Sequence, residues 1–549
     1  MLDLVIAGGL VVDGTGAPGF RGWVGVDGDR IAVVAHEGTP VPEAARTIDA
    51  EGQVVAPGFI DVHNHSDLSP FVLPEMPSVI RQGVTTVVVG NCGLSPWPLA
   101  GYPEAVELAY ADPADHPVPS WESFGDYLAA IDEAKPAVNV AALVGHGSIR
   151  LEVLGNERRP PDATELDRMR GLVADAIDAG AVGLSTGLIY TPGIHATTDE
   201  VVALAEESAA LGGIYASHIR GEGRDLFRAV DEALEIGRRA GLPVHVSHLK
   251  CESSLVWGRA GELLERIHGA EDATGDQYPY AAWNSSLASL LPPWASPDEL
   301  ERVARDASQR DRLRRAVEEG EDGFQSSIDG VGWDRIVIVG TKDERWRGHD
   351  VASIAAEMGF DPFAAFVRLL VEDPSTSCIG HAMHEDDVRT IVADPEVFVA
   401  SDGSAIDPAS PAGSLPVHPR DYGTFPRVLA RYVREEGVLS LEAAIRKMTS
   451  LPADRFGLTG RGRIAEGSSA DLVIFEPGAV TDEAIYESPH RFPTGISAIV
   501  VNGRIGNEAG GADAGRVLLP PMTPSTRPAS GVADRRSETL FDPDPSGSG

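Results

Sequence analysis

The chain has 549 residues, a formal net charge of −38 and an isoelectric point near 4.7. Such an acidic chain disfavours nucleic acid and anionic membranes as partners and favours solubility. Three cysteines (Cys92, Cys251 and Cys378) are too few for a disulfide framework, which predicts a reducing, cytoplasmic setting. No apolar run approaches the length of a membrane span, and the N-terminus is expected to be a first strand rather than a signal peptide.

Short apolar runs separated by Gly and Asp turn signals occupy residues 1–56, and the same pattern returns in residues 456–519. This spacing is typical of short antiparallel strands. We therefore expect both ends of the chain to contribute to one small β-sandwich domain. Residues 520–549 are rich in Pro, Ser, Gly and Asp, a composition that cannot bury a core and predicts a disordered tail.

Between these ends, residues 57–455 alternate apolar strands with amphipathic helical patterns. This alternation predicts an α/β protein, specifically a closed (β/α)8 TIM barrel. A charged helical stretch at about residues 290–342 interrupts the rhythm, and we expect it to be a lid inserted after strand seven. The eight predicted strands lie within residues 54–65, 85–93, 138–148, 181–188, 213–221, 243–251, 276–280 and 397–405.

The first barrel strand leads into the sequence DVHNHSD, which places His63 and His65 two residues apart. Residues i and i+2 of an extended strand point to the same face, so the two imidazoles would lie side by side, as a metal requires. A single His-x-His is not specific, because two histidines can equally be surface residues.

Other metal-type side chains also fall at predicted strand ends, which are the functional edge of such a barrel. They provide nitrogen, sulfur and oxygen donors, a mixed set that suits zinc with an open position for water. Each residue alone has an ordinary structural explanation, but their recurrence at successive strand ends favours a metal site. The residues are Cys92, His146, His218, His248 and Asp402.

The chain resembles the N-acyl-D-amino-acid deacylase (D-aminoacylase) family of the amidohydrolase superfamily over about residues 3–505. An NCG cysteine, here Cys92, marks that family. The matching segments are GFIDVHNHSD (58–67), GVTTVVVGNCGLSP (83–96), GLSTGLIYTPG (183–193), YASHIRGEG (215–223), VHVSHLK (244–250), YPY (278–280), SDG (401–403), HPRDYGTFPR (418–427), LSLEAAIRKMTSLPADRFGL and ADLVIFEP.

The resemblance implies zinc-dependent hydrolysis of N-acyl-D-amino acids. It implies one tight zinc held by Cys92, His218 and His248, and a second, weaker site that uses His63, His65 and Asp402 and shares Cys92. Asp402 would act as general base and then general acid, and Tyr190 would lie near the carbonyl oxygen. The residues implied to hold the substrate carboxylate are Lys250, Tyr278 and Arg420.

Three features distinguish this sequence from related amidohydrolases. Hydantoinases and dihydroorotases bridge two metals with a carboxylated lysine on strand four, whereas AVGLSTGLIY has no lysine. The family's small Gly/Ser-rich stretch after YPY is replaced here by AAWNSS, so Trp283 and Asn284 are expected to alter the substrate pocket. The loop from Asp402 to Arg420 is rich in Pro and Ala, which bears on how Arg420 approaches the site.

Alternative functions remain open on sequence grounds, because a fold does not fix a substrate. They are a D-specific dipeptidase, another amide or cyclic-amide hydrolase, and a metal-binding relative without catalysis. The sequence leaves the oligomeric state open. His381 and His384 are expected at the start of a surface helix, His245 is expected to face away from His248, and Cys251 is expected to be a packing residue.

Overall fold

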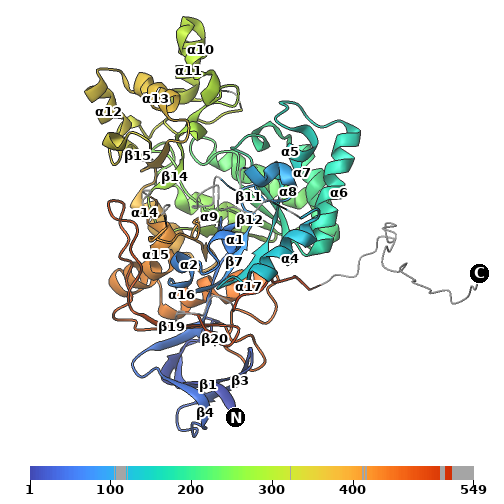
Figure 1. The fold of residues 1–549 in the computed structure, drawn as a ribbon, viewed down its shortest axis with the longest axis vertical. Helices are drawn as coiled ribbons and strands as arrows, with labels where there is room; N and C mark the ends of the chain where they lie inside the picture. The colour runs from blue at the N-terminus through green and yellow to red at the C-terminus, as the bar shows by residue number, and fades with distance from the viewer. Residues whose placement is uncertain are drawn as a thin grey trace, which may run out of the picture.

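The computed structural model describes residues 1–103, 106, 119, 121–321, 323–410, 413, 417–506 and 514–521. Figure 1 shows three layers along the long axis of the molecule. A small β-sheet lies at one end, an α/β body lies in the middle, and a largely helical region lies at the other end. In the part of the chain so described, no helix is long and apolar enough to cross a membrane.

The central body contains a succession of parallel strands that follow chain order. Each strand pairs with the next one in the list. The exception is β8 and β9, which follow each other along the chain with Leu143 between them; β8 pairs with β7, and β9 pairs with β10. Asn64, after the first strand, forms a parallel bridge with Gly403, after the last. This order is consistent with the predicted barrel. The strands are β6 (Phe59–Asp61), β7 (Val84–Val89), β8 (Asn139–Ala142), β9 (Val144–Gly145), β10 (Gly183–Gly187), β11 (Ile214–His218), β12 (Val244–Val246), β13 (Ala273–Gln277) and β17 (Phe398–Val399).

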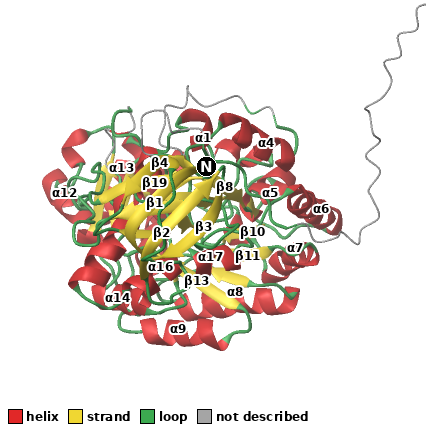
Figure 2. Ribbon diagram, turned by 90° about the horizontal axis from the view of Figure 1, so that it is seen from below, coloured by secondary structure: helices red, strands yellow, loops and turns green. Residues whose placement is uncertain are grey.

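Helices lie around the periphery of the molecule in the view from below (Figure 2). Local sequence signals set their ends: α6 begins with a capping box between Asp162 and Glu165 and ends at Gly180, whose φ is 118°. The helices are α1 (Ser69–Val72), α2 (Pro77–Ile80), α4 (Phe124–Ala134), α5 (His146–Leu154), α6 (Ala163–Ala179), α7 (Thr198–Ala210), α8 (Leu226–Ala240), α9 (Ala260–Gly269), α14 (Glu385–Ala393), α15 (Arg420–Arg427), α16 (Leu441–Met448) and α17 (Ser450–Arg455).

Both ends of the chain contribute strands to the small sheet. β18 pairs antiparallel with β5, and β5 pairs parallel with β1, so the two ends form one hydrogen-bonded sheet rather than two separate sheets. Buried Ile6, Val24, Leu472 and Val500 belong to its core. The strands are β1 (Leu2–Val11), β2 (Phe20–Asp27), β3 (Arg30–His36), β4 (Ala44–Asp49), β5 (Val54–Pro57), β18 (Leu472–Phe475), β19 (Ile496–Val501) and β20 (Arg504–Ile505).

The inserted region is larger than the predicted 290–342. A short antiparallel sheet brackets it, because β14 pairs with β16 across about ninety residues of chain, and β15 pairs with the other side of β16. The helical stretch recognised in the sequence is therefore only its first half. The elements are β14 (Trp283–Ser286), α10 (Leu300–Arg305), α11 (Ala307–Glu319), β15 (Ile336–Gly340), α12 (Val351–Met358), α13 (Pro362–Glu372) and β16 (Ser377–Gly380).

The last described segment, residues 514–521, pairs with the body of the molecule. Val140 on β8 donates its N–H to the Arg516 carbonyl at 3.0 Å and accepts from the Leu518 N–H at 2.8 Å. This segment therefore lies beside strand β8, whereas residues 456–519 are predicted from the sequence to belong to the small β domain. Of the predicted tail, residues 522–549 lie outside the described residues.

Candidate metal centre

Six predicted ligands converge at the carboxyl ends of five strands. His63 and His65 follow β6, Cys92 follows β7, His218 ends β11, His248 follows β12, and Asp402 follows β17. The donor atoms form two overlapping sets, and within each set all atoms lie within 4.8 Å of one another. One set is His63, Cys92, His248 and Asp402, and the other is His218, Glu222 and His248. The structure therefore brings together the six ligands that the family resemblance implies, but not His146, which bonds to Glu200.

Cys92 is at the centre of the group. Its Sγ lies 3.6 Å from His218 Nδ1, 3.8 Å from His248 Nε2 and 3.2 Å from His63 Nε2. On a tetrahedral zinc with ordinary bond lengths, a sulfur and a nitrogen ligand are about 3.6 Å apart. The separations of Cys92 Sγ from His218 Nδ1 and His248 Nε2 are therefore close to those between ligands of a tetrahedral zinc.

His63, His65 and Asp402 form the neighbouring set. Asp402 Oδ1 lies 3.1 Å from His65 Nε2 and 3.4 Å from His63 Nε2, and the two imidazole centroids are 5.3 Å apart. β6 ends at Asp61, so both histidines lie just beyond the strand instead of within it. Their side chains nevertheless share one face. The Nδ1 atoms of both are buried without a hydrogen-bond partner among the described residues.

The backbone of three ligands adopts the left-handed region. The φ angles are 54° at Cys92, 37° at His248 and 50° at Asp402. Non-glycine residues in this region cost on the order of 1–3 kcal/mol, and they cluster at functional sites. The strand ends therefore turn sharply at the points where ligand side chains must face inward. Gly93 allows the turn after Cys92, because its φ is 76° and an added Cβ would lie 2.6 Å from the Gly187 nitrogen.

The surrounding charges keep Cys92 and Asp402 ionised. Burial alone would raise both pKa values. The neighbouring histidines, His63 first among them, instead hold the pKa of the Cys92 thiol well below its ordinary value. The Arg420 guanidinium, followed by His65 and His63, holds the pKa of Asp402 well below its usual range. Thiolate and carboxylate are the forms that ligate metals.

The three predicted substrate residues lie together beside this group. The Tyr278 ring packs between two cations, with Lys250 Nζ 5.5 Å and the Arg420 guanidinium carbon 5.0 Å from its centroid. The Tyr278 hydroxyl is buried and has no hydrogen-bond partner among the described residues. Arg420 Nη1 also donates to Asp402 Oδ2 at 2.6 Å. Both cations thus have an acid partner, because Lys250 Nζ lies 2.8 Å from Glu222 Oε1.

Tyr190, the remaining predicted catalytic residue, packs against His218 with ring centroids 4.8 Å apart. Burial, together with the charges of Cys92, Asp402 and Glu222, raises the pKa of Tyr190 well above its ordinary value. Its hydroxyl therefore remains protonated and is able to donate a hydrogen bond.

Two buried acids beside the ligands were not recognised in the sequence. Glu222 contacts His248 and Lys250, and Asp276 accepts from the His248 backbone N–H at 2.9 Å while Oδ2 lies 3.5 Å from His63 Nδ1. Asp276 is the charged residue of β13, whose other residues are uncharged. A charged residue in a buried strand was the available signal, because such residues are rarely buried without a partner.

His146, His245, His384 and Cys251 lie outside the centre. His146 bonds to Glu200 at 3.0 Å, and His245 bonds to Asp276 at 2.8 Å and packs against Phe398. His384 is the N-cap of α14, which confirms its predicted place at a helix start.

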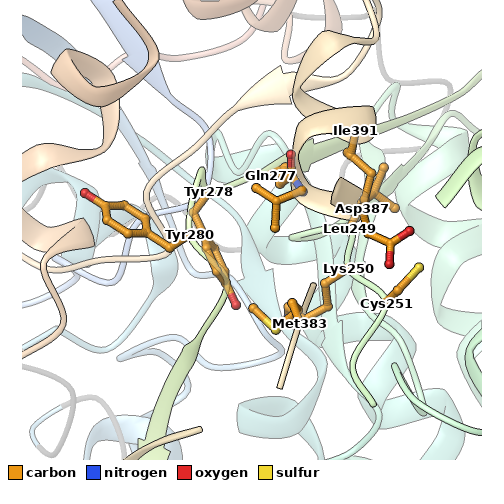
Figure 3. Close-up of a pocket in the computed structure, with 10 residues that line it drawn as sticks. Leu249, Lys250, Cys251, Gln277, Tyr278, Tyr280, Met383, Asp387 and Ile391 are labelled. Atoms are coloured by element: carbon orange, nitrogen blue, oxygen red, sulfur yellow. The ribbon is translucent and has the colours of Figure 1, made fainter. Parts of the chain in front are cut away.

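A small cavity separates Lys250 and Tyr278 from α14 (Figure 3). The volume of the cavity is about 10 Å³, enough for about one water molecule. Cys251 lines it together with Leu249, Gln277 and Met383. Cys251 is thus a packing residue, and burial raises the pKa of its thiol to about 12.

The chain belongs to the amidohydrolase family, whose model matches residues 46–505. It is 40% identical to an N-acyl-D-glutamate deacylase of Alcaligenes xylosoxydans xylosoxydans, over 91% of this chain and 93% of the relative. It is 36% identical to a D-aminoacylase of the same organism, over 94% and 97% of the two chains.

A solved structure resembles the whole chain. It is the N-acyl-D-glutamate deacylase of Bordetella bronchiseptica, complexed with zinc and a phosphonate inhibitor that mimics the tetrahedral intermediate of the reaction. The identity is 35%, the TM-score is 0.77, and the match covers 94% of this chain and 99% of the other. The resemblance inferred from sequence motifs is therefore confirmed.

Proposed function

We propose that this protein is a zinc-dependent amidohydrolase that cleaves N-acyl-D-amino acids to a carboxylate and a free D-amino acid. The observation that carries the proposal is the position of Tyr278 between Lys250 and Arg420, beside the ligand group. A substrate carboxylate needs cationic groups and hydrogen-bond donors, and these three side chains bring an ammonium, a hydroxyl and a guanidinium to one place. The relatives named as deacylases of N-acyl-D-amino acids support the same substrate class.

In this proposal Cys92, His218 and His248 hold one tight zinc. His63, His65 and Asp402 form a second, weaker site that shares Cys92. The donor set and the Sγ–N separations support the assignment. When bound, zinc supplies a Lewis acid for the amide carbonyl and lowers the pKa of water.

The protein's own groups move the protons. Asp402 accepts the proton of the attacking water on a carboxylate oxygen and later donates it to the leaving nitrogen. General acid–base help of this kind contributes about 10²–10⁴-fold. The protonated Tyr190 hydroxyl donates to the carbonyl oxygen as negative charge develops, a contribution of about 3 kcal/mol for one donor. The substrate carboxylate is held by Lys250, Tyr278 and Arg420, which therefore select the configuration of the substrate.

The inserted region would serve as the lid of a closed barrel. Its contacts with the loops that follow the His218 and His248 strands support this role. Gln325 accepts from the Gly223 N–H at 3.2 Å, Arg224 Nη2 lies 2.5 Å from Asp329 Oδ2, and the Ala382 carbonyl accepts from the Ser253 N–H at 2.9 Å. The division into a barrel at 57–455 and a two-part β domain, and the cytoplasmic location, stay predictions.

A panel of N-acyl-D- and N-acyl-L-amino acids, assayed for free amine, tests the function. We expect turnover of D substrates and little turnover of L substrates. Three fixed carboxylate donors and a fixed carbonyl position allow only one enantiomer to bind productively. Turnover of D-dipeptides or cyclic amides alone would reassign the substrate class. Bound metal with no hydrolysis of any amide would favour a non-catalytic relative.

A further inference from the structure

Glu222 lies among three residues to which the proposed function assigns a role. It is buried and belongs to the loop after β11, four residues beyond His218. Its Oε1 lies 2.9 Å from His248 Nδ1, and its Oε2 lies 3.7 Å from His218 Nε2. Both oxygens accept from Lys250 Nζ, at 2.8 and 2.9 Å. One carboxylate therefore contacts the substrate lysine and faces two of the three proposed tight ligands.

The contact with His248 fixes the tautomer of that ring. His248 Nε2 faces Cys92 Sγ, so it is the nitrogen available to a metal. A ligating nitrogen carries no proton, so the proton of the neutral ring is on Nδ1 and needs an acceptor. Lys250 Nζ, although 2.9 Å from Nδ1, has only donors. Glu222 is consequently the group that accepts the Nδ1 proton of His248.

His218 has the opposite orientation. Its Nδ1 faces Cys92 Sγ, and its Nε2 is buried without a hydrogen-bond partner among the described residues. The distance of 3.7 Å from Nε2 to Glu222 Oε2 is longer than a hydrogen bond, but the second oxygen of the same carboxylate faces this nitrogen. The two ligand rings thus present different nitrogens to the metal position and direct their outer nitrogens at one acid.

We propose that Glu222 is a positioning residue of the metal centre, which holds His218 and His248 in their ligating tautomers and compensates the charge of Lys250. The inference rests on the proposed metal site. Carboxylates that accept from a ligating histidine fix its ring and raise its basicity, and their loss costs about 10–100-fold in metal affinity or activity. Because the same carboxylate binds Lys250, the loop after β11 links the metal ligands to the substrate-binding side of the site.

Zinc release from the loaded protein tests this role without substrate. Wild type, Glu222→Gln and Glu252→Gln are loaded with zinc, and transfer of the metal to a chromophoric chelator is followed in time. Glu252 is a suitable control because it is another buried acid, two residues from Lys250, with no hydrogen bond to His218 or His248 among the bonds seen between described residues. We expect Glu222→Gln to release zinc about 10–100-fold faster than wild type, and Glu252→Gln to match wild type.

A conservative variant separates positioning from general loosening of the fold. Glu222→Asp restores a charged acceptor on a side chain that is one methylene shorter, so we expect it to release zinc more slowly than Glu222→Gln but faster than wild type. Release from Glu222→Gln at the wild-type rate, or equal acceleration in both Glu222 variants and in Glu252→Gln, would overturn the proposal.

Two further outcomes are decisive. A folded Glu222→Gln protein that cannot be loaded with zinc would make Glu222 itself a ligand and overturn the positioning role. If Glu222→Gln fails to fold, Glu222→Asp is compared with wild type alone, and faster release supports the proposal whereas unchanged release overturns it. Wild type that binds no zinc would instead contradict the proposed metal site.

Discussion

Arg420 and Asp402 form a buried ion pair, in which Arg420 Nη1 donates to Asp402 Oδ2 at 2.6 Å. The proposed substrate-binding cation is therefore in contact with the proposed general base. A guanidinium has five N–H donors in a planar fork whose geometry matches that of a carboxylate. The pair also explains why the pKa of Asp402 is low, since Arg420 makes the largest favourable contribution to its ionised form.

Arg420→Ala should affect both recognition and the base. Truncation of one partner of a buried charge pair costs about 2–5 kcal/mol, and we expect a loss of this size in kcat/KM for an N-acyl-D-amino acid. The loss should be much smaller for an N-acyl amine that lacks the carboxylate. The pKa of Asp402 should rise, which moves the acid limb of the pH–rate profile to higher pH.

Arg427→Ala is the matched control, because Arg427 lies on the same helix and pairs with Asp482. It should change kcat/KM equally for the two substrates. Equal losses on both substrates in Arg420→Ala would assign that residue to the fold instead of to recognition.

Cys92→Ala should lose most of the zinc that wild type retains through purification. Cys92 Sγ lies within 3.8 Å of a ring nitrogen of His63, His218 and His248, so its removal takes away a donor of the tight set. Elemental analysis of purified protein measures the effect. Cys251→Ala should retain the metal, because Cys251 lines the adjoining cavity without facing the ligands. Wild-type zinc content in Cys92→Ala would remove that residue from the ligand set.

Asp402→Asn should keep the fold and the tight zinc while kcat falls by about 10²–10⁴-fold, the usual contribution of a general base. The amide keeps the shape of the side chain but cannot accept the water proton. Steady-state kinetics and zinc analysis on the same preparation separate the two effects. A variant that retains more than about a tenth of wild-type kcat would show that Asp402 is structural.

Asp421→Asn should change how stability depends on pH. Burial raises the pKa of Asp421 to about 7, and the backbone N–H of Ser404 is its hydrogen-bond donor at 2.8 Å. In the unfolded chain an aspartate titrates near 3.9, so between about pH 4 and pH 7 the folded state binds more protons and stability falls as pH rises. Asp421→Asn has no carboxyl group at this position, so its stability should not fall with pH in this way.

Denaturant unfolding at about pH 5 and about pH 8 compares the two proteins. Relative to wild type, Asp421→Asn should gain stability at the higher pH, by about 1.4 kcal/mol for each unit of the lost shift. A difference between the proteins that is the same at both pH values would contradict the buried, protonated state of Asp421.

Removal of the helical part of the insertion should impair catalysis more than folding. A Gly/Ser linker in place of residues 291–334 keeps β14, β15 and β16 and removes Gln325 and Asp329, which contact the loop after β11. Because that loop follows His218, a loss of about 10²-fold in kcat/KM is expected, as for a displaced catalytic group. Unchanged kcat/KM in a well-folded protein would exclude a lid.

The ligand group could be anticipated from sequence because each member ends a locally recognisable strand. An apolar run followed by His, Cys or Asp is a short-range pattern, and parallel strands bring such ends to one edge. The β14–β16 pairing was not recognisable, because it joins segments about ninety residues apart and each is only four residues long. The sequence therefore predicts only the helical part, at about residues 290–342, and not the strands on either side of it.

Glu222 was missed for a different reason. It lies in a loop, in the sequence HIRGEG, where a glutamate is ordinarily a solvated residue. Only the positions of His248 and Lys250, supplied by the next strand, show that it is buried and paired. The partners of a loop residue are set by tertiary structure, which periodicity and spacing do not report.

The left-handed backbone at Cys92, His248 and Asp402 limits how this centre can be redesigned. Asparagine, aspartate and histidine tolerate this conformation better than other residues with a Cβ, whereas β-branched side chains are genuine outliers there. An engineer who exchanges the thiolate for another donor should therefore begin with His or Asp at position 92 and avoid threonine. The choice of metal is restricted by the shape of the chain as well as by the chemistry of its side chains.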